Sequence, residues 1–343
     1  MAKKIKVLIV DDSIVFREML ARGISVDPAI EVVGTAANPY EASDMIVELE
    51  PDVLTVDVEM PRMNGIEFVR RLMPQYPIPV VMISALNTAV FEALQAGAVD
   101  FVGKPETGST ERTVKAFINE LIIKIKIAST AKVGAKKSEL KHNHSIASVG
   151  ASSNKKIVAI GASTGGTEAI NYIIKNLPAD MPGIVVVQHM PPVFTRMFAE
   201  RLNDICPLEV REARDGDQIS PGLVLIAPGD FQMMVARTGT IYTVKCRPGE
   251  RVNGHCPSVD VLFHSVADQY KANSLGVILT GMGYDGAKGL LAMRQKGART
   301  IGQDERTSVV YGMPKVAFNI GAVERQSSLE KMPALICSIL SEK

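Results

Sequence analysis

The feature that most restricts the fold of this chain is a regular alternation of short apolar runs with segments of helical periodicity. In the first third, apolar runs typical of buried strands cover residues 5–10, 30–36, 53–57, 80–84 and 99–103. Helical patterns follow them at residues 14–25, 39–49, 64–73, 89–95 and 110–129. Because parallel strands need helical crossovers, this alternation predicts an α/β domain with a doubly wound, five-stranded parallel sheet.

The alternation resumes from Ile157. Further apolar runs cover residues 183–188, 223–227 and 275–280, and helical patterns cover residues 168–176, 195–203, 259–269, 287–295 and 328–341. Residues 231–236 and 240–245, on either side of a glycine-containing turn, indicate an antiparallel hairpin. The second half is therefore expected to be another α/β domain, with a mostly parallel sheet and one antiparallel excursion.

A chain of 343 residues is long for a single core, which favours two domains. Residues 130–154 are rich in lysine, serine and alanine and lack an apolar period, so they are expected to form a flexible linker between domains at 1–129 and 155–343. Within the linker, His142 and His144 are expected to be exposed side chains and not metal ligands.

Composition restricts the environment and the partners. The formal net charge of +1 carries no signature of polyanion binding, so no role with nucleic acid is expected. Four widely spaced cysteines argue against a zinc site or a disulfide framework and suit a reducing compartment. No signal-like segment or membrane-length apolar run occurs in the sequence. We therefore expect a cytoplasmic, monomeric protein that does not insert into a membrane.

Polar residues stand at the carboxyl ends of four predicted strands of the first domain. They are Asp11, Asp12, Asp57, Ser84 and Lys104. The carboxyl ends of parallel strands share one edge of a sheet, where open α/β sheets bind ligands. Three converging carboxylates suit a hard divalent cation such as Mg²⁺. With a lysine and a hydroxyl nearby, such a site can stabilise a phosphoryl group transferred to a carboxylate.

These residues resemble the receiver domain of two-component response regulators. The resemblance rests on Asp11-Asp12, on Asp57 in a segment that continues to Met63-Asn64-Gly65, on Ser84-Ala85 and on Lys104-Pro105. It implies a flavodoxin-like fold and phosphorylation of Asp57 by a histidine kinase. It also implies Mg²⁺ held by Asp12, Asp57 and the backbone carbonyl of Glu59 with help from Asp11, and a switch through Ser84. Phe101 occupies the aromatic switch position and lacks the hydroxyl of the commoner tyrosine.

The second domain opens on a candidate nucleophile. A β-branched run from Ile157 leads into the turn Gly161-Ala162-Ser163-Thr164-Gly165, which has the Gly-x-Ser-x-Gly pattern, and then into a helical segment. Ser163 would then stand at the carboxyl end of a strand, with unpaired N–H groups of the helix start beside it. The same pattern also suits a glycine-rich phosphate cradle, so the surrounding residues must decide between the two.

A serine nucleophile needs a base, and histidine is the usual one. His189 follows a predicted strand and would share the edge of Ser163, whereas His255 lies in a loop and is the alternative. Asp285, after another predicted strand, can orient the imidazole, while Asp260 is the alternative acid and resembles a first-turn helix residue. The order Ser, His, Asp differs from that of α/β-hydrolases.

The second domain resembles the catalytic domain of chemotaxis protein-glutamate methylesterases. The resemblance rests on Gly161–Gly166, Gln188-His189-Met190, Pro228-Gly229-Asp230, the segment from His255 to Phe263, and Leu279–Gly286. It implies hydrolysis of γ-glutamyl methyl esters and deamidation of glutamines on methyl-accepting chemotaxis receptors, with a chemotaxis histidine kinase as phosphodonor. Cys256 stands where the family often has arginine.

The expected mechanism uses Ser163 as nucleophile, His189 as base and Asp285 to orient the base, with no cofactor for the ester reaction. Backbone N–H groups of Thr164 and Met282 are expected to bind the oxyanion, because both follow glycine-flanked turns at the same edge. The receiver is expected to cover the Ser163 cleft until Asp57 is phosphorylated. Alternatives of another class are a nucleotide-binding module, disfavoured by the lack of a P-loop lysine, and a DNA-binding output, for which no helix-turn-helix pattern is seen.

Overall fold

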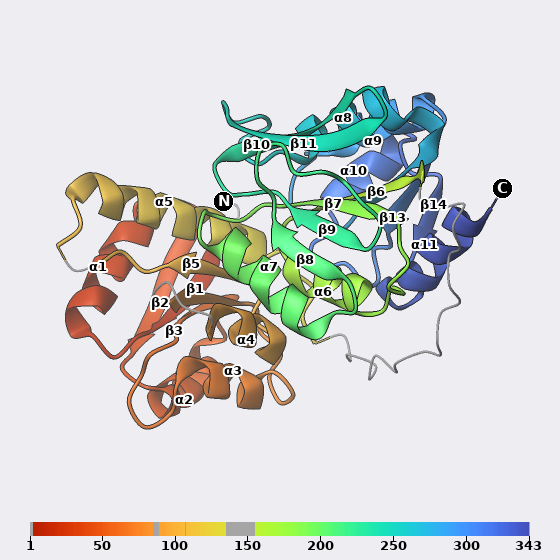
Figure 1. Ribbon diagram of the computed structural model, residues 1–343. Coiled ribbons are helices and arrows are strands. Elements are labelled where there is room, and N and C mark those ends of the chain that lie inside the picture. The colour runs from red at the N-terminus through yellow and green to blue at the C-terminus, as the bar shows by residue number, and fades with distance from the viewer. Residues whose placement is uncertain (1–2, 85–88, 107, 135–154, 343) are drawn as a thin grey trace. The chain divides into compact units, whose positions relative to one another are not determined.

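The computed structural model describes residues 3–84, 89–106, 108–134 and 155–342. The chain divides into two compact units, Met1–Lys137 and Ser138–Lys343, and each is described by itself (Figure 1). Most of the predicted linker, including His142 and His144, lies outside the described residues. The domain boundaries at 129 and 155 therefore stay predictions.

The first unit contains a five-stranded parallel sheet in the order β2-β1-β3-β4-β5, with all strand pairs parallel. Its strands are β1 (Ile5–Val10), β2 (Ile30–Ala36), β3 (Val53–Asp57), β4 (Val80–Ser84) and β5 (Asp100–Gly103). Its helices are α1 (Ile14–Ile24), α2 (Pro39–Leu49), α3 (Gly65–Leu72), α4 (Ala89–Ala96) and α5 (Glu111–Ala128). The predicted doubly wound sheet is confirmed.

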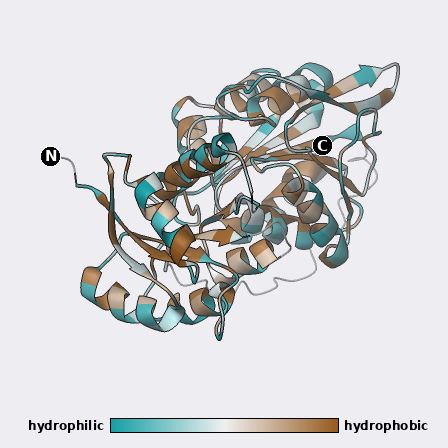
Figure 2. Cartoon of the chain, turned by 90° about the vertical axis from the view of Figure 1, so that its left-hand side faces the viewer, coloured by the Kyte–Doolittle hydropathy of each residue, from teal (hydrophilic) through white to brown (hydrophobic). Residues whose placement is uncertain are grey.

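Local sequence accounts for the boundaries of these helices. Ser13, Asn38, Asn64 and Thr110 act as N-caps, each side chain accepting a hydrogen bond from a backbone N–H of the first helical turn. Strands β3 and β4 are buried along their whole length, as the continuous apolar runs predict. Figure 2 shows hydrophobic colour concentrated on the strands and hydrophilic colour on the outer faces of the helices.

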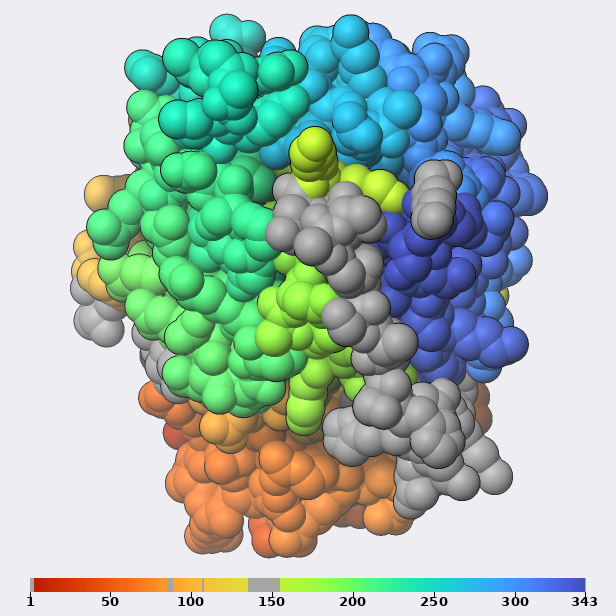
Figure 3. Space-filling model, turned by 45° about the vertical axis from the view of Figure 1, so that its right-hand side comes forward, coloured from red at the N-terminus to blue at the C-terminus, as the bar shows by residue number. Residues whose placement is uncertain are grey.

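The second unit contains a seven-stranded, wholly parallel sheet in the order β14-β13-β12-β6-β7-β9-β8. Its strands are β6 (Ile157–Ala162), β7 (Gly183–Gln188), β8 (Glu209–Glu212), β9 (Leu223–Ile226), β12 (Ser274–Ile278), β13 (Arg299–Gln303) and β14 (Arg325–Ser327). In Figure 3 the yellow-green atoms from the start of this unit lie between green atoms and dark blue atoms on the surface.

The helices of the second unit are α6 (Gly166–Lys175), α7 (Phe194–Ile205), α8 (Val259–Tyr270), α9 (Ala287–Gln295), α10 (Met313–Asn319) and α11 (Met332–Ser341), with short 3₁₀ turns η2 (Lys271–Asn273) and η3 (Leu329–Lys331). The predicted hairpin is present as β10 (Phe231–Thr238) and β11 (Ile241–Pro248). Its strands are longer than predicted, and they form a two-stranded sheet of their own instead of joining the main one.

The topology of the main sheet determines where a site can form. β6 pairs with β7 on one side and with β12 on the other, although β12 comes more than a hundred residues later in the chain. The chain thus leaves β6 in one direction and returns to its opposite side, which makes the carboxyl end of β6 a topological switch point. Ligands of open α/β sheets bind at such points, and Ser163 directly follows β6.

Candidate active site

Ser163 lies in a tight turn between β6 and α6. Its N–H donates to the Thr280 carbonyl over 3.0 Å, and its own carbonyl accepts from the Gly166 N–H over 2.7 Å. Gly165, with φ of 77°, supplies the left-handed residue that the turn needs. A Cβ on Gly281 would lie 2.7 Å from the Cβ of Ser163, so only glycine allows this approach. The Ser163 side chain remains partly exposed and therefore accessible to a substrate.

His189 follows β7 and is held beside this turn. Ala162 and Gln188 are paired in the β6–β7 register, and the His189 N–H donates to the Ala162 carbonyl over 3.1 Å. Its ring nitrogen Nε2 lies 2.8 Å from Oδ2 of Asp285. The other ring nitrogen, Nδ1, is buried and has no hydrogen-bond partner in the described part of the chain. Asp285 thus occupies one ring nitrogen of His189 and leaves Nδ1 open to another group.

Asp285, in the loop after β12, is enclosed by the N-terminal end of α8. Its Oδ1 accepts from Asn253 Nδ2 over 2.8 Å, from Ser258 Oγ over 2.8 Å and from the Asp260 N–H over 3.2 Å. Its Oδ2 accepts from the Val259 N–H over 2.7 Å. Burial alone would raise the pKa of Asp285, but the hydrogen bonds and the nearby imidazole hold that pKa well below its usual range. The group is therefore a carboxylate at neutral pH.

Gln188 ties the serine turn to the histidine, a structural role that no spacing or periodicity in the sequence indicates. The side chain is buried, and its Nε2 donates to the Ser163 carbonyl over 2.9 Å and to the His189 carbonyl over 3.2 Å. A Cβ on Gly166 would lie 2.2 Å from Gln188 Oε1, so glycine is required there as well. These contacts fix the backbone on which both side chains depend.

The alternatives raised by the sequence occupy other places. The ring of His255 does not take the Asp285 contact but stacks on the ring of His189. Asp260 is a buried first-turn residue of α8 whose carboxylate accepts from the Gly289 N–H over 2.7 Å and from Asn253 over 2.8 Å. His264 is exposed on the outer side of the same helix. The structure thus brings His189 and Asp285 together and gives Asp260 a structural contact.

The predicted oxyanion donors lie in the two turns that meet at Ser163. The carbonyl of buried Thr164 accepts a hydrogen bond from Thr280 Oγ1 over 3.0 Å, which joins the two turns. Met282, between Gly281 and Gly283, is 41% exposed. Its backbone N–H donates to no residue in the described ranges. That N–H is available to a substrate oxygen.

The first unit contains the predicted acidic cluster. Ligand oxygens of Asp11, Asp12 and Asp57 all lie within 4.8 Å of one another, and Asp12 is exposed while the other two are buried. Lys104 Nζ bonds Asp11 Oδ2 over 3.0 Å and Asp57 Oδ2 over 2.8 Å. An all-oxygen set with one solvent-facing member fits Mg²⁺, which prefers carboxylate and water ligands.

Burial raises the pKa of Asp57 to about 6, with the Asp11 charge adding to this effect and Lys104 opposing it. The N–H of Glu59 also donates to the Asp57 carboxylate. Ser84, at the end of β4, is buried, and its carbonyl accepts from the Lys104 N–H over 2.7 Å. The side chain of Phe101 is buried as well. Lys104 therefore contacts the acidic cluster directly and Ser84 bonds to Lys104 at the end of the neighbouring strand, whereas Phe101 lies within β5.

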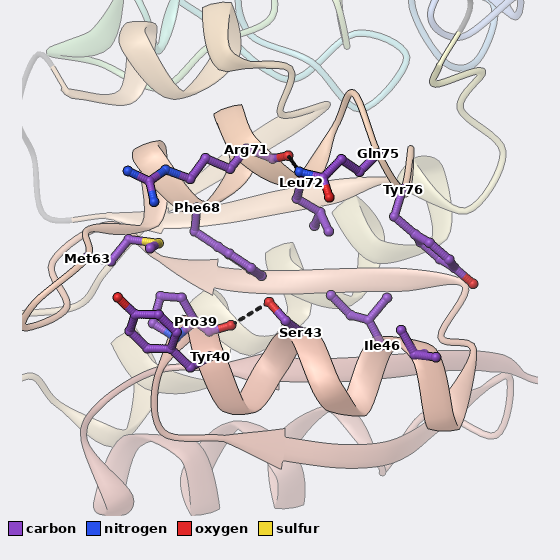
Figure 4. Close-up of a pocket in the computed structure, with 11 residues that line it drawn as sticks. Pro39, Tyr40, Ser43, Ile46, Met63, Phe68, Arg71, Leu72, Gln75 and Tyr76 are labelled. Carbon is purple, nitrogen blue, oxygen red and sulfur yellow. Dashed lines mark hydrogen bonds between the residues drawn. The ribbon is translucent and has the colours of Figure 1, made fainter.

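A separate groove of about 410 Å³ lies on the same unit between α2 and α3. Figure 4 shows Phe68 and Leu72 of α3 facing Tyr40 and Ile46 of α2 across it. None of the predicted site residues lines this groove.

No helix among the described residues is long and apolar enough to cross a membrane.

The fold and the two sites together point to a response regulator whose output domain is a hydrolytic enzyme with a parallel α/β sheet. Comparison with known families agrees: residues 7–116 match the response regulator receiver domain, and residues 158–336 match the CheB methylesterase. The chain belongs to the CheB methylesterase family, in the form that carries a receiver domain.

Relatives of this family resemble the chain over nearly its full length. The protein-glutamate methylesterase/protein-glutamine glutaminase 2 of Syntrophomonas wolfei is 58% identical over 342 residues, covering 99% of each chain. The corresponding protein of Salmonella typhimurium is 47% identical over 333 residues, covering 96% of this chain and 95% of its own. The crystal structure of the Thermotoga maritima CheB methylesterase catalytic domain is 40% identical with a TM-score of 0.53, covering 54% of this chain and 98% of that one.

Proposed function

We propose that this protein-glutamate methylesterase and protein-glutamine glutaminase works through Ser163, His189 and Asp285 on the glutamyl side chains of chemotaxis receptors. The observation that carries the assignment is the 2.8 Å contact between His189 and Asp285 directly beside the Ser163 turn. Membership of the CheB methylesterase family gives the reaction, and this contact supports the choice of residues.

In the first half of the reaction, His189 accepts the proton of the Ser163 hydroxyl as the oxygen attacks the carbonyl carbon of the γ-glutamyl ester. The tetrahedral intermediate then collapses, the C–O bond to the methoxy group breaks, and methanol leaves with the proton from His189. Asp285 remains ionised throughout, because four hydrogen bonds from residues 253–260 stabilise its charge. It orients the imidazole and stabilises the imidazolium.

In the second half, His189 removes a proton from water, the resulting hydroxide attacks the acyl-enzyme, and Ser163 leaves as its hydroxyl. The product is a free glutamate side chain. A glutamine substrate follows the same path, except that ammonia replaces methanol as the leaving group. One site therefore accounts for both activities named for the family.

For the oxyanion we propose the backbone N–H groups of Thr164 and Met282. The Met282 N–H has no acceptor among the described residues, and its neighbour Gly281 packs on Ser163. Thr164 stands one residue beyond the nucleophile, at the start of α6, where the helix dipole favours negative charge. These two N–H groups would stabilise the negative charge that develops on the carbonyl oxygen of the substrate in the transition state.

For the receiver we propose phosphorylation of Asp57 by a histidine kinase, with Asp12, Asp57 and the Glu59 carbonyl holding Mg²⁺ and Asp11 assisting. The compact acidic cluster supports this donor set. When bound, the ion offsets the negative charge of the transferred phosphoryl group. Lys104 contacts both buried carboxylates and would bind the phosphoryl oxygens. The hydroxyl of Ser84 would act as the switch that responds to phosphorylation. We further propose a cytoplasmic location and restraint of the catalytic unit by the unphosphorylated receiver.

Replacement of Ser163 tests the catalytic assignment. Ser163→Ala should lower methanol release from a methyl-esterified receptor fragment by at least about 10³-fold, because the nucleophile itself is lost. Thermal melting should stay within a few degrees of the parent protein, since the side chain is partly exposed and donates no structural hydrogen bond to a described residue. Turnover retained by a folded Ser163→Ala protein would contradict the proposal.

A further inference from the structure

His255 lies face to face with the proposed base. The ring centroids of His189 and His255 are 3.6 Å apart, and their planes differ by 8°. The side chain of His189 is only 7% exposed. One edge of the His189 ring is held by Asp285 and one face is covered by His255, which leaves little freedom for the ring to rotate.

The turn that carries His255 is also bonded to Asp285. Val252 and His255 exchange two backbone hydrogen bonds of 2.9 and 3.0 Å, closing a four-residue turn. Asn253 within it has φ of 53° and donates its amide to Asp285 over 2.8 Å and to Asp260 over 2.8 Å. A single short turn therefore contacts both members of the His189–Asp285 pair.

The same turn is anchored to the hairpin on its other side. Gln232, a buried residue of β10, donates its amide to the carbonyl of His255 over 3.3 Å and to the carbonyl of Glu250 over 2.9 Å. Its Oε1 accepts from the Ser258 N–H over 2.9 Å. The backbone of His255 is thus fixed relative to the start of α8, which holds Asp285.

We propose that His255 is a positioning residue of the esterase: its ring, stacked on His189, keeps the imidazole in the plane that leaves Nε2 on Asp285 and Nδ1 for Ser163. The inference rests on the proposed role of His189 as base. His255 acts through its flat ring and transfers no proton. A base that turns away from the nucleophile loses the near-attack geometry on which the rate depends.

The test compares flat and non-flat replacements in the full-length protein, activated with a small phosphodonor and Mg²⁺. His255→Ala and His255→Leu should lower kcat for methanol release about 10- to 100-fold, with KM changed less than about twofold, because the ring is lost while the substrate contacts remain. His255→Phe should restore kcat to within about threefold of the parent, since a phenyl ring can stack in the same place. His264→Ala, a change on the exposed side of α8, should leave kcat unchanged.

Inactivation by a serine-directed fluorophosphonate gives a second readout that needs no receptor, and its rate should follow the same order. Equal rates for the parent, alanine and leucine variants would overturn the inference. A phenylalanine variant as slow as the leucine variant would also overturn it, since the nitrogen atoms of the ring would then be needed. His189→Ala in the same assays separates the two proposals: full activity there would remove His189 as the base, whatever the His255 variants show.

Discussion

At the scale of single residues, Asp285 is almost fully buried and is surrounded by hydrogen-bond donors. Its two oxygens accept hydrogen bonds from Asn253, Ser258 and two backbone N–H groups of α8, and they face His189. A buried carboxylate with so many donors is stabilised as an anion, and the donors in turn depend on it. The carboxylate that we propose for catalysis is therefore also one on which the folded structure depends.

We expect Asp285→Asn to abolish turnover and to lower the free energy of unfolding by about 2–4 kcal/mol, because an amide presents an NH₂ group to buried donors. The folded-state pKa of Asp285 lies below the ordinary 3.8, so the folded chain binds fewer protons than the unfolded chain as the pH falls. The stabilisation of the fold by the ionised carboxylate is complete above the unfolded-state pKa of 3.8. It is lost as the pH falls below 3.8 towards the folded-state pKa. Urea unfolding at several pH values should show the difference between parent and variant shrinking below pH 3.8.

Asp268→Asn is the matched control for this measurement. Asp268 belongs to α8, the helix whose N-terminal end binds Asp285, but its side chain is exposed and pairs with Lys296 at the surface. Exposed ion pairs contribute little, so the change should stay within about 0.5 kcal/mol at every pH. A difference for Asp285→Asn that is as small as the control, or that does not vary with pH, would show that the hydrogen bonds do not stabilise the anion.

The sequence predicts the members of the site that follow apolar strands and misses those that come from loops. Ser163, His189 and Asp285 each follow a buried run, so their shared edge could be deduced from the parallel topology, and the structure places them there. Their catalytic roles stay predictions. Asn253 reaches Asp285 across 32 positions of the chain, and no local pattern signals such a contact.

At the scale of elements, the site depends on how closely α8 approaches β6. Gly161 of β6 faces Val259 at the first turn of α8, and a Cβ on Gly161 would lie 2.1 Å from Cγ1 of Val259. The N-terminal end of α8 is the part that holds Asp285. The missing side chain of Gly161 therefore fixes the distance between the strand that leads to Ser163 and the helix that binds Asp285.

Gly161→Ala should accordingly destabilise the catalytic unit by about 1–3 kcal/mol and lower kcat, because the added methyl group pushes α8 outward. Val259→Ala should be destabilising by itself, since it leaves a cavity. The double variant should be more stable than the sum of the two single changes predicts, by about 1 kcal/mol or more, because the new methyl group then has room. Urea unfolding of all four proteins measures this coupling, and strict additivity would exclude the proposed contact.

Most elements could be predicted, and the strands for which the sequence carries no signal share a physical cause. The run 183–188 is continuous and apolar, and β7 has the predicted bounds. β8, β13 and β14 are short and contain charged or polar residues at most positions. They are strands because neighbouring strands of the parallel sheet supply their hydrogen bonds. This stabilisation comes from residues far away in the chain, so the local pattern of apolar residues does not predict it.

At the scale of the whole molecule, the chain consists of two compact units, with the acidic cluster of the receiver domain in one and the His189–Asp285 pair of the methylesterase domain in the other. Covalent linkage gives each unit a high effective concentration near the other, so even a weak contact between them can control activity. A contact that depends on the state of Asp57 would then act as a switch between restrained and active forms.

A fragment of residues 155–343 should release methanol about 5- to 150-fold faster than the unphosphorylated full-length protein, the range of ordinary coupling free energies. The solved catalytic domain from Thermotoga maritima, which matches this part of the chain, supports its folding alone. A small phosphodonor with Mg²⁺ should bring the full-length protein toward the rate of the fragment and should leave both the fragment and an Asp57→Asn full-length protein unchanged. Assays on one methyl-esterified receptor fragment measure all these rates. If the isolated fragment is no faster than the unphosphorylated chain, the receiver does not restrain the catalytic unit, and any activation by phosphorylation must then arise from a positive effect of the phosphorylated receiver on that unit.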